Sequence, residues 1–154
     1  MKNILLACIL LLSTPLWAET VNDNIPMIKK QFLIIKATKS YQEAKQVAEK
    51  LSQRLNIKLD LRNLQYHEKN FLTMPQKDCK ANEADYPCYV PRGRYDDGIY
   101  ISIEHSNSYE NFKDGYYIVI AASGDDAKEY LKPVKEVVKD AYVKSSKVYM
   151  GCLH

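Results

Sequence analysis

Apolar and polar positions follow two different periods along the chain, and these periods predict a mixed α+β domain. Short β-branched runs and strict alternation predict five strands, at residues 31–37, 57–62, 98–104, 115–122 and 141–150. Apolar residues at helical spacing predict two amphipathic helices, over residues 40–56 and 123–138. The first begins with the capping pattern of Ser40 and Glu43, and Pro133 should kink or restart the second.

The predicted order is strand, helix, strand, inserted loop, strand, strand, helix, strand. Residues 32–51 and 117–138 share a weak strand–turn–helix repeat, which suggests two similar halves that pair into one sheet. We therefore expect a ferredoxin- or ribonucleoprotein-like α+β sandwich with a mostly antiparallel sheet. Both helices should cover one face of that sheet and leave the opposite face open.

Residues 65–97 interrupt this order as a long loop with few periodic apolar positions. The loop holds three prolines and two of the chain's four cysteines. A loop of this length inside a compact domain is usually functional or stapled. Three pairings are open among Cys79, Cys88 and Cys152, and we expect Cys79 and Cys88, which are nearest in sequence, to form the disulfide.

The first 18 residues have the layout of a cleaved secretory signal peptide. Lys2 gives a positive start, residues 4–12 are apolar, and the small Ala18 precedes a plausible cleavage point. The apolar run is shorter than the ~20 residues of a membrane helix, which argues against the alternative of an uncleaved anchor. We therefore expect a periplasmic or secreted protein without a membrane span in its mature chain. A disordered lead-in at 19–30 would precede a single domain at 31–154.

Charge and histidine spacing narrow the range of ligands. The chain carries 22 Lys and Arg against 19 Asp and Glu, and loss of Lys2 leaves 21 against 19. This small excess of positive charge differs from the clustered basic face that nucleic-acid-binding proteins carry, so we do not expect nucleic acid as a partner. The spacing of the histidines, at His67, His105 and His154, matches no metal motif, and we predict neither a metal nor another cofactor. The oligomeric state stays open.

Two segments of this layout resemble the sporulation-related (SPOR) repeat of bacterial envelope proteins. They are residues 32–40 with 44–51, and residues 116–123 with 127–138. The resemblance implies a βαββαβ fold and, as the ligand, peptidoglycan glycan strands stripped of their stem peptides. Residues 36–40 lack the Gln and the Gly-Ser-Phe of the family's first strand, and the cysteine-containing loop is an insertion, so no individual binding residue is carried over.

The densest candidate for ligand binding is the segment 86–117, which contains seven of the 12 tyrosines. Sugars present apolar C–H faces beside rings of hydroxyl groups. A glycan site therefore needs flat aromatic side chains next to Arg, which pairs with carboxylates, and next to polar groups that bind hydroxyls. The predicted ligand-binding residues are Arg92, Arg94, Tyr95, Asp96, Tyr100, Ser102, Glu104 and Tyr117. Tyr is also common in strands, and residues 96–98 are typical of an ordinary turn.

The same segment does not predict an enzyme. Asp96 and Asp97 are adjacent and cannot flank one glycosidic bond, and Glu104 alternates with isoleucines and is expected to face solvent. Ser106 follows His105, but no nucleophile elbow surrounds any serine. We therefore predict a non-catalytic module that binds peptidoglycan glycan. The alternative is a periplasmic inhibitor or immunity protein that binds a cell-wall-degrading enzyme through its disulfide-stapled loop.

Overall fold

The structure, a computed structural model, describes residues 27–151. The predicted signal peptide, residues 19–26 of the predicted lead-in, Cys152 and His154 lie outside the described residues.

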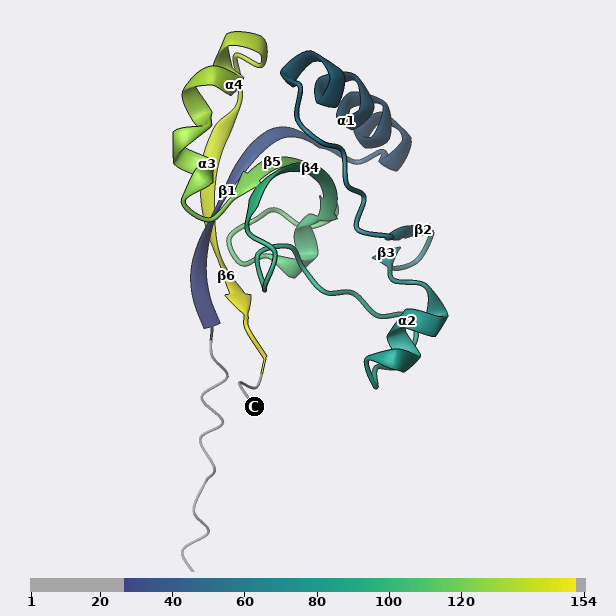
Figure 1. The fold of residues 1–154 in the computed structure, drawn as a ribbon. Helices are drawn as coiled ribbons and strands as arrows, with labels where there is room; N and C mark the ends of the chain where they lie inside the picture. The colour runs from purple at the N-terminus through teal and green to yellow at the C-terminus, as the bar shows by residue number, and fades with distance from the viewer. Residues whose placement is uncertain (1–26, 152–154) are drawn as a thin grey trace, which may run out of the picture.

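Four antiparallel strands form one sheet in the order β4-β5-β1-β6 (Figure 1). They are β1 (Met27–Thr38), β4 (Gly98–His105), β5 (Tyr117–Ser123) and β6 (Tyr142–Tyr149). The first strands of the two predicted halves, β1 and β5, lie side by side in the middle of the sheet. β1 also starts earlier than predicted: residues 27–30 pair with β6, so they belong to the sheet and not to a disordered lead-in at 19–30.

Both predicted helical segments pack on one face of the sheet (Figure 1), which confirms the predicted α+β, ferredoxin-like architecture. α1 (Tyr41–Leu55) ends where Asn56 takes a left-handed conformation. The second segment divides into α3 (Asp126–Glu129) and α4 (Leu131–Val137), a restart close to Pro133. No helix in residues 27–151 is long and apolar enough to cross a membrane.

Ser40 caps α1 as predicted, because its side-chain oxygen accepts a hydrogen bond from the Glu43 backbone N–H at 3.2 Å. We expect Ser40→Ala to lower the free energy of unfolding by about 1 kcal/mol, since it leaves that N–H without its acceptor. Ser40→Asp keeps an acceptor and is the matched control. Equal denaturation midpoints for Ser40→Ala and the wild type would contradict this role.

The opposite face of the sheet is largely covered, which corrects the prediction of an open face. Residues 89–97 cross it so closely that a Cβ atom on Gly93 would lie 3.0 Å from the Phe32 ring. Residues 106–116, which begin with the short 3-10 helix η1 (Ser106–Ser108), place Tyr109 edge-on against Phe32. These two segments cover a second apolar cluster that consists of Phe32, Ile34, Tyr109, Ile118, Ile120 and Val148. Strand alternation predicts which residues share a face, but it does not say which loop covers them.

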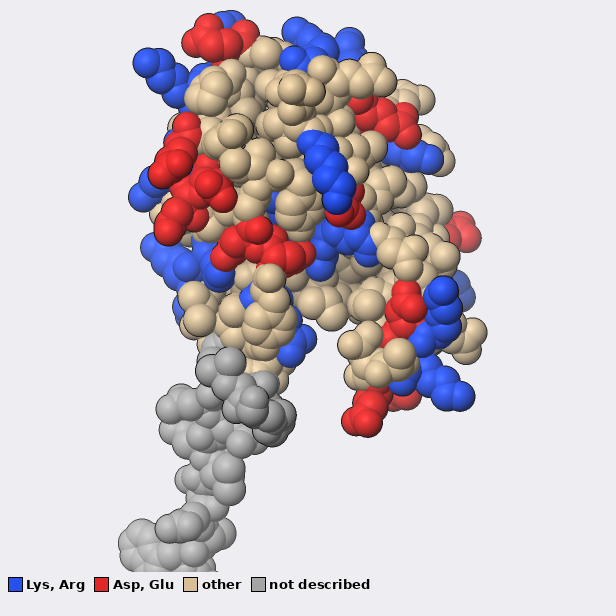
Figure 2. All heavy atoms as spheres, viewed as in Figure 1, with Lys and Arg blue, Asp and Glu red and all other residues tan. Residues whose placement is uncertain are grey.

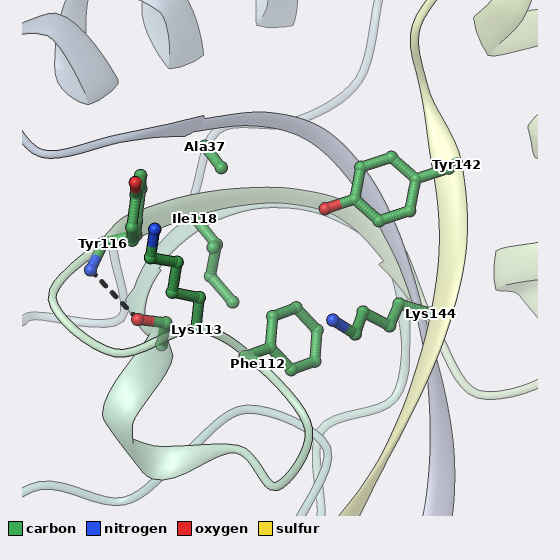
Figure 3. Close-up of a pocket in the computed structure, with 8 residues that line it drawn as sticks. Ala37, Phe112, Lys113, Tyr116, Ile118, Tyr142 and Lys144 are labelled. Atoms are coloured by element: carbon green, nitrogen blue, oxygen red, sulfur yellow. Dashed lines mark hydrogen bonds between the residues drawn. The ribbon is translucent and has the colours of Figure 1, made fainter.

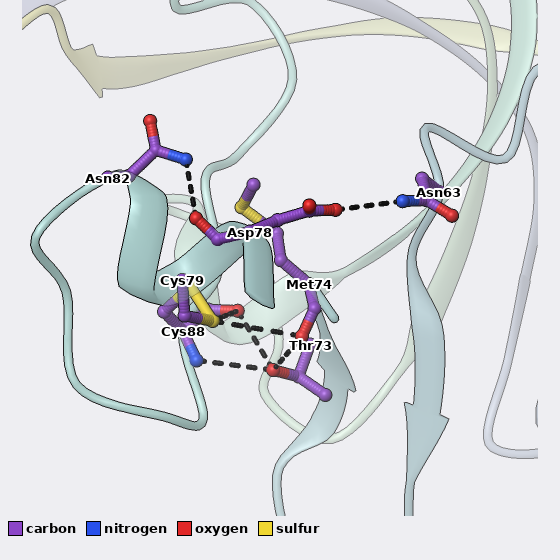
Figure 4. The surroundings of a disulfide bond; sticks show 7 residues. All are labelled: Asn63, Thr73, Met74, Asp78, Cys79, Asn82 and Cys88. Carbon is purple, nitrogen blue, oxygen red and sulfur yellow. Dashed lines mark hydrogen bonds between the residues drawn. A yellow bond between two sulfur atoms is a disulfide. The ribbon is translucent and has the colours of Figure 1, made fainter. Parts of the chain in front are cut away.

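The predicted loop 65–97 contains secondary structure of its own. β2 (Gln65–His67) and β3 (Phe71–Thr73) form a hairpin, and α2 (Gln76–Ala81) follows. The predicted Cys79–Cys88 disulfide is confirmed, and beside it Cys88 N–H donates to Thr73 Oγ1 at 3.1 Å (Figure 4). We call residues 65–88 the stapled lobe. In the space-filling view it stands out from the body of the domain (Figure 2).

The strand predicted at 57–62 is wrong. Leu59 makes only an isolated parallel bridge to Ile101, and Arg62 and Asn63 both take positive φ angles. The backbone therefore turns toward the stapled lobe after a single contact with the sheet.

Candidate functional site

Arg92, which was predicted to bind ligand, is fully buried and forms the centre of a polar network. Its guanidinium donates to the Ser123 and Ser102 hydroxyls at 3.2 and 3.1 Å. It also donates to the backbone carbonyls of Gly98, Tyr100 and Ile120 at 2.8, 2.8 and 3.1 Å. The register of β4 against β5 shifts between Ile99 and Ser102, and a bulge of this kind leaves ladder groups without a strand partner. Arg92 satisfies such groups and fastens residues 89–97 to the sheet.

Glu104, expected to face solvent, is also fully buried. One carboxylate oxygen accepts from Arg62 at 2.8 Å and from the hydroxyl of Tyr89, and it lies 3.4 Å from the Tyr109 hydroxyl. Burial, and then the charge of Glu104, hold the pKa of Tyr89 well above its usual value, so this phenol keeps its proton and donates a hydrogen bond to the carboxylate. A buried carboxylate persists when it is paired and hydrogen-bonded in this way.

The structure therefore corrects half of the predicted ligand-binding set. Arg92, Ser102 and Glu104 are fully buried, and Tyr117 is 4% exposed. Tyr117 packs against Tyr41 and Phe71 on the helix side of the sheet, with ring centroids 5.5 and 5.7 Å away, and its pKa is raised to about 12 by burial. Side chains without accessible surface cannot contact a glycan, so these four hold the fold together instead.

The other four predicted residues are at least partly accessible, but they are engaged with the protein itself. Asp96 pairs with Arg62 at 3.0 Å and accepts a hydrogen bond from Tyr100. Arg94 lies over the rings of Tyr95 and Tyr149, 5.2 Å from each centroid. Tyr95 is 67% exposed, and its hydroxyl donates to the carbonyl of Met150, the residue that follows β6. The eight residues thus do not converge on one concave surface.

A different concavity lies on the uncovered part of the sheet face, at the other end of β6 (Figure 3). We call it the sheet-face groove, and its volume is about 140 Å³. It is lined by Ala37, Ser106, Phe112, Lys113, Tyr116, Ile118, Tyr142 and Lys144. Three of the eight lining residues are aromatic and two are lysines, whereas none is acidic.

Each wall of the groove is positioned by a local feature of the backbone. A register shift in β1 between Ile34 and Lys36 places Ala37 on the groove floor beside Ile118 of β5. The loop 106–116 forms one wall of the groove, and hydrogen bonds join its two ends. Tyr116 N–H donates to Ser106 Oγ at 3.0 Å, and Ser106 N–H donates to the Tyr116 carbonyl at 2.8 Å. The aromatic side chain of Phe112 is then held on Tyr109, at 5.6 Å between centroids.

The cations of the groove lie against its aromatic rings. Lys144 Nζ is 4.5 Å from the Phe112 centroid, and Lys113 Nζ is 5.7 Å from that of Tyr116. Lys39 approaches the same Tyr116 ring, also at 5.7 Å. Burial raises the pKa of Tyr142, so its phenol stays protonated and can donate or accept a hydrogen bond. The groove therefore offers flat apolar surface, hydroxyl groups and positive charge to an incoming ligand.

Sequence reasoning missed this groove because residues 105–114 resemble a polar turn. The signal was present in the two aromatic residues within that turn, Tyr109 and Phe112, since aromatic side chains in a short polar segment need a surface to pack on. The alternation of Tyr142 and Lys144 on one face of the last strand was the matching signal.

One histidine–hydroxyl contact has the components of a catalytic pair. His105 Nε2 lies 3.1 Å from Ser108 Oγ, but His105 Nδ1 is buried without a hydrogen-bond partner among residues 27–151. A catalytic imidazole is normally oriented through that second nitrogen. The His105 ring is instead packed between Phe71 and Tyr89, at 5.6 and 4.4 Å between centroids, and it joins the stapled lobe to β4.

Burial lowers the pKa of His105, and this predicts a pH-dependent stability. The imidazole takes up a proton less readily in the folded than in the unfolded chain, whose histidines titrate near ~6.5. Its contribution to stability is therefore present above that pH and is lost as the pH falls through the folded pKa. We expect His105→Phe, which keeps a flat ring in the stack, to lose less stability than the wild type between pH 7.5 and pH 5. Parallel losses in denaturation at the two pH values would contradict this.

The fold and the groove together define the class of protein: an α+β domain of ferredoxin-like architecture with an aromatic, lysine-lined groove on its sheet face. Comparison with protein-family models, with curated proteins and with solved structures finds no match. The geometry and chemistry of the groove are accordingly the evidence for the function of the protein.

Proposed function

We propose that this protein is an exported, non-catalytic module that binds peptidoglycan glycan strands in the bacterial envelope, and that the sheet-face groove is its binding site. The observation that carries the proposal is the lining of the groove, in which Phe112, Tyr116 and Tyr142 surround two lysines without an acidic residue. Aromatic faces pack against the C–H faces of sugar rings, and ammonium groups bind carboxylates.

The charge of the groove favours one state of the glycan. Strands without stem peptides carry a free carboxylate on each muramic acid, whereas intact strands have that carboxylate in an amide bond. Lys113 and Lys144 could each pair with such a carboxylate, because their ammonium groups lie at the groove on its loop and strand walls (Figure 3). The resemblance of the strand–helix segments to SPOR repeats supports the same ligand.

Retention on purified sacculi tests the proposal. The chain from residue 19 onward should be retained after an amidase has removed the stem peptides, and retained less on untreated sacculi. No retention on either preparation would refute the function.

Substitutions in the groove should weaken this retention. We expect Tyr142→Ala and Lys144→Ala each to lower the affinity about tenfold, since each removes a contact worth about 1–1.5 kcal/mol. Tyr86→Ala is the matched control for Tyr142→Ala, because both tyrosines are 44% exposed and Tyr86 lies in the stapled lobe. Equal losses from Tyr86→Ala and Tyr142→Ala would place binding elsewhere.

A second candidate function rests on the stapled lobe. The lobe projects from the body and is held in shape by the Cys79–Cys88 disulfide and by the hydrogen bond from Asn63 to Asp78 at 2.9 Å. A rigid projection suits an inhibitor or immunity protein that inserts into the cleft of a cell-wall-degrading enzyme. Slowed hydrolysis of cell wall by such an enzyme, relieved by deletion of residues 79–88, would favour this function over glycan binding.

A further inference from the structure

A second concavity, with a volume of about 220 Å³, lies on the helix side of the sheet where α1 begins. We call it the α1 pocket, and it has room for several water molecules. Its lining comes from the turn before α1, the first turn of α1, β2 and β5, and consists of Lys39, Ser40, Tyr41, Gln42, Tyr66 and Tyr117. None of these six residues is acidic. The sheet-face groove lies on the other face of the sheet, so a ligand in the α1 pocket would bind independently of glycan in the groove.

Tyr117 lines the α1 pocket with a hydroxyl group that the protein does not use. The residue is only 4% exposed, and within residues 27–151 its hydroxyl makes no hydrogen bond. Three polar side-chain atoms in that part of the chain are enclosed without a partner, and the Tyr117 oxygen is not one of them. The small accessible part of Tyr117 therefore includes its hydroxyl. This opening is too small for a sugar ring, but one oxygen of a small ligand can reach the hydroxyl, which a buried tyrosine normally pairs.

The first turn of α1 supplies two further donors. The first intrahelical bond runs from Ala44 N–H to the Ser40 carbonyl, and Ser40 Oγ accepts from Glu43 N–H. The N–H groups of Tyr41 and Gln42 precede these bonds and have no acceptor among the described residues. They lie at the positive end of a 15-residue helix, where an anion is stabilised.

Positive charge reaches the α1 pocket from Lys39. Its ammonium group lies 5.7 Å from the centroid of the Tyr116 ring and forms no ion pair within residues 27–151. Glu43, the acidic residue nearest to it in sequence, is engaged by Lys36 at 2.7 Å and by the Thr38 hydroxyl. The pocket therefore presents donors and a cation without a carboxylate that competes for them.

Tyr66 adds a flat wall to these donors. Its ring stacks on that of Tyr41, with centroids 5.3 Å apart and planes at 19°, and the residue is 52% exposed. The donors come from three elements of the fold. A phosphate monoester offers three strong acceptor oxygens in three directions, whereas the two oxygens of a carboxylate lie in one plane. We propose that the α1 pocket binds the phosphate group of a small phosphate monoester whose ring-shaped body packs against Tyr66.

Titration of the isotope-labelled chain from residue 19 onward with phenyl phosphate, inorganic phosphate and benzoate tests this proposal. We expect phenyl phosphate to bind with a Kd of about 1 mM, and inorganic phosphate, which lacks the ring, to bind about fivefold more weakly. Benzoate should also bind more weakly than phenyl phosphate. The largest amide shifts should fall on Tyr41 and Gln42, because their N–H groups would donate directly to the phosphate.

Tyr117→Phe separates binding from folding. It keeps the buried ring and removes only the unpaired hydroxyl, so the affinity for phenyl phosphate should fall about tenfold while the denaturation midpoint is not lowered. Tyr130→Phe is the matched control, since Tyr130 is also partly buried and does not line the α1 pocket. Lys39→Gln should weaken binding about fivefold at low salt and less at high salt. Lys50→Gln, further along α1, should bind as the wild type does.

Three results would overturn the proposal. The first is no binding of phenyl phosphate up to about 20 mM. The second is a set of shifts on residues 112–116 and 142–144 with none on residues 41 and 42, since the anion would then occupy the sheet-face groove. The third is an affinity that Tyr117→Phe leaves unchanged. Tighter binding of benzoate than of phenyl phosphate would contradict the choice of phosphate.

Discussion

Arg92→Met is expected to destabilise the protein by about 3–5 kcal/mol, because it removes a fully buried guanidinium and leaves its acceptors unpaired. Three of those acceptors are backbone carbonyls, those of Gly98 and Tyr100 at the β4 bulge and that of Ile120 on the neighbouring β5. The methionine side chain fills much of the same volume. The loss therefore reports on the hydrogen bonds more than on a cavity.

Chemical denaturation of Arg92→Met beside Arg94→Met measures this effect. Arg94 is partly exposed and lies on Tyr95 and Tyr149, so its loss should cost about 1 kcal/mol or less. Equal costs for the two variants would mean that Arg92 does not fasten residues 89–97 to the sheet. In that case the covered sheet face would need another explanation.

Removal of the disulfide is the second large effect. We expect the double variant Cys79→Ser/Cys88→Ser to lose about 2–3 kcal/mol, the range for a short closed loop. The effect should concentrate in the stapled lobe, because most of the main apolar cluster, including Leu33, Ile103 and Val119, comes from the sheet and its helices, while the lobe contributes Leu72.

Hydrogen exchange on the double variant separates the two regions. Amides of α2 and of the β2–β3 hairpin should exchange faster, while those of β1 and β5 stay protected. Glycan retention should also persist, because the disulfide is not part of the sheet-face groove. Loss of protection throughout the sheet would show instead that the lobe is part of the folding core.

The strongly periodic elements could be predicted from the sequence. α1 was found with its Ser40 cap and its end at Asn56, because apolar spacing and capping act within the helix itself. The strand at 57–62 was not found correctly, although its residues alternate. Alternation of apolar and polar residues indicates that one side of a segment is buried. A segment can be buried on one side without pairing with a strand of the sheet.

The candidate site could be predicted only in its chemistry. Tyrosine was expected and lines the groove, but it lies beside lysines and not beside the predicted Arg and Asp side chains. Of the predicted set, four residues lie at positions 92–96, which cover the sheet, and the other four lie in strands β4 and β5. Glu104 illustrates the reason. It alternates with Ile101 and Ile103 as predicted, so it lies on the side of β4 away from the helices. That side is covered by residues 89–97, and no local sequence pattern shows that this loop packs back against the strand.

The register shift in β1 likewise could not be predicted from the sequence, and it decides on which side of the sheet Ala37 lies. A strand read with strict alternation would place Ala37 on the helix side with Ile35. The shift between Ile34 and Lys36 turns Ala37 to the groove floor instead. Such bulges depend on the pairing with β5, which a single sequence does not define.

Chemical-shift mapping with a soluble glycan fragment tests the central claim most directly. A peptide-free glycan oligosaccharide is titrated into the isotope-labelled chain from residue 19 onward. The largest amide shifts should fall on Ala37, on residues 112–116 and on residues 142–144, the walls and floor of the sheet-face groove. An absence of shifts, or shifts confined to the stapled lobe or to Arg94 and Tyr95, would contradict glycan binding in this groove.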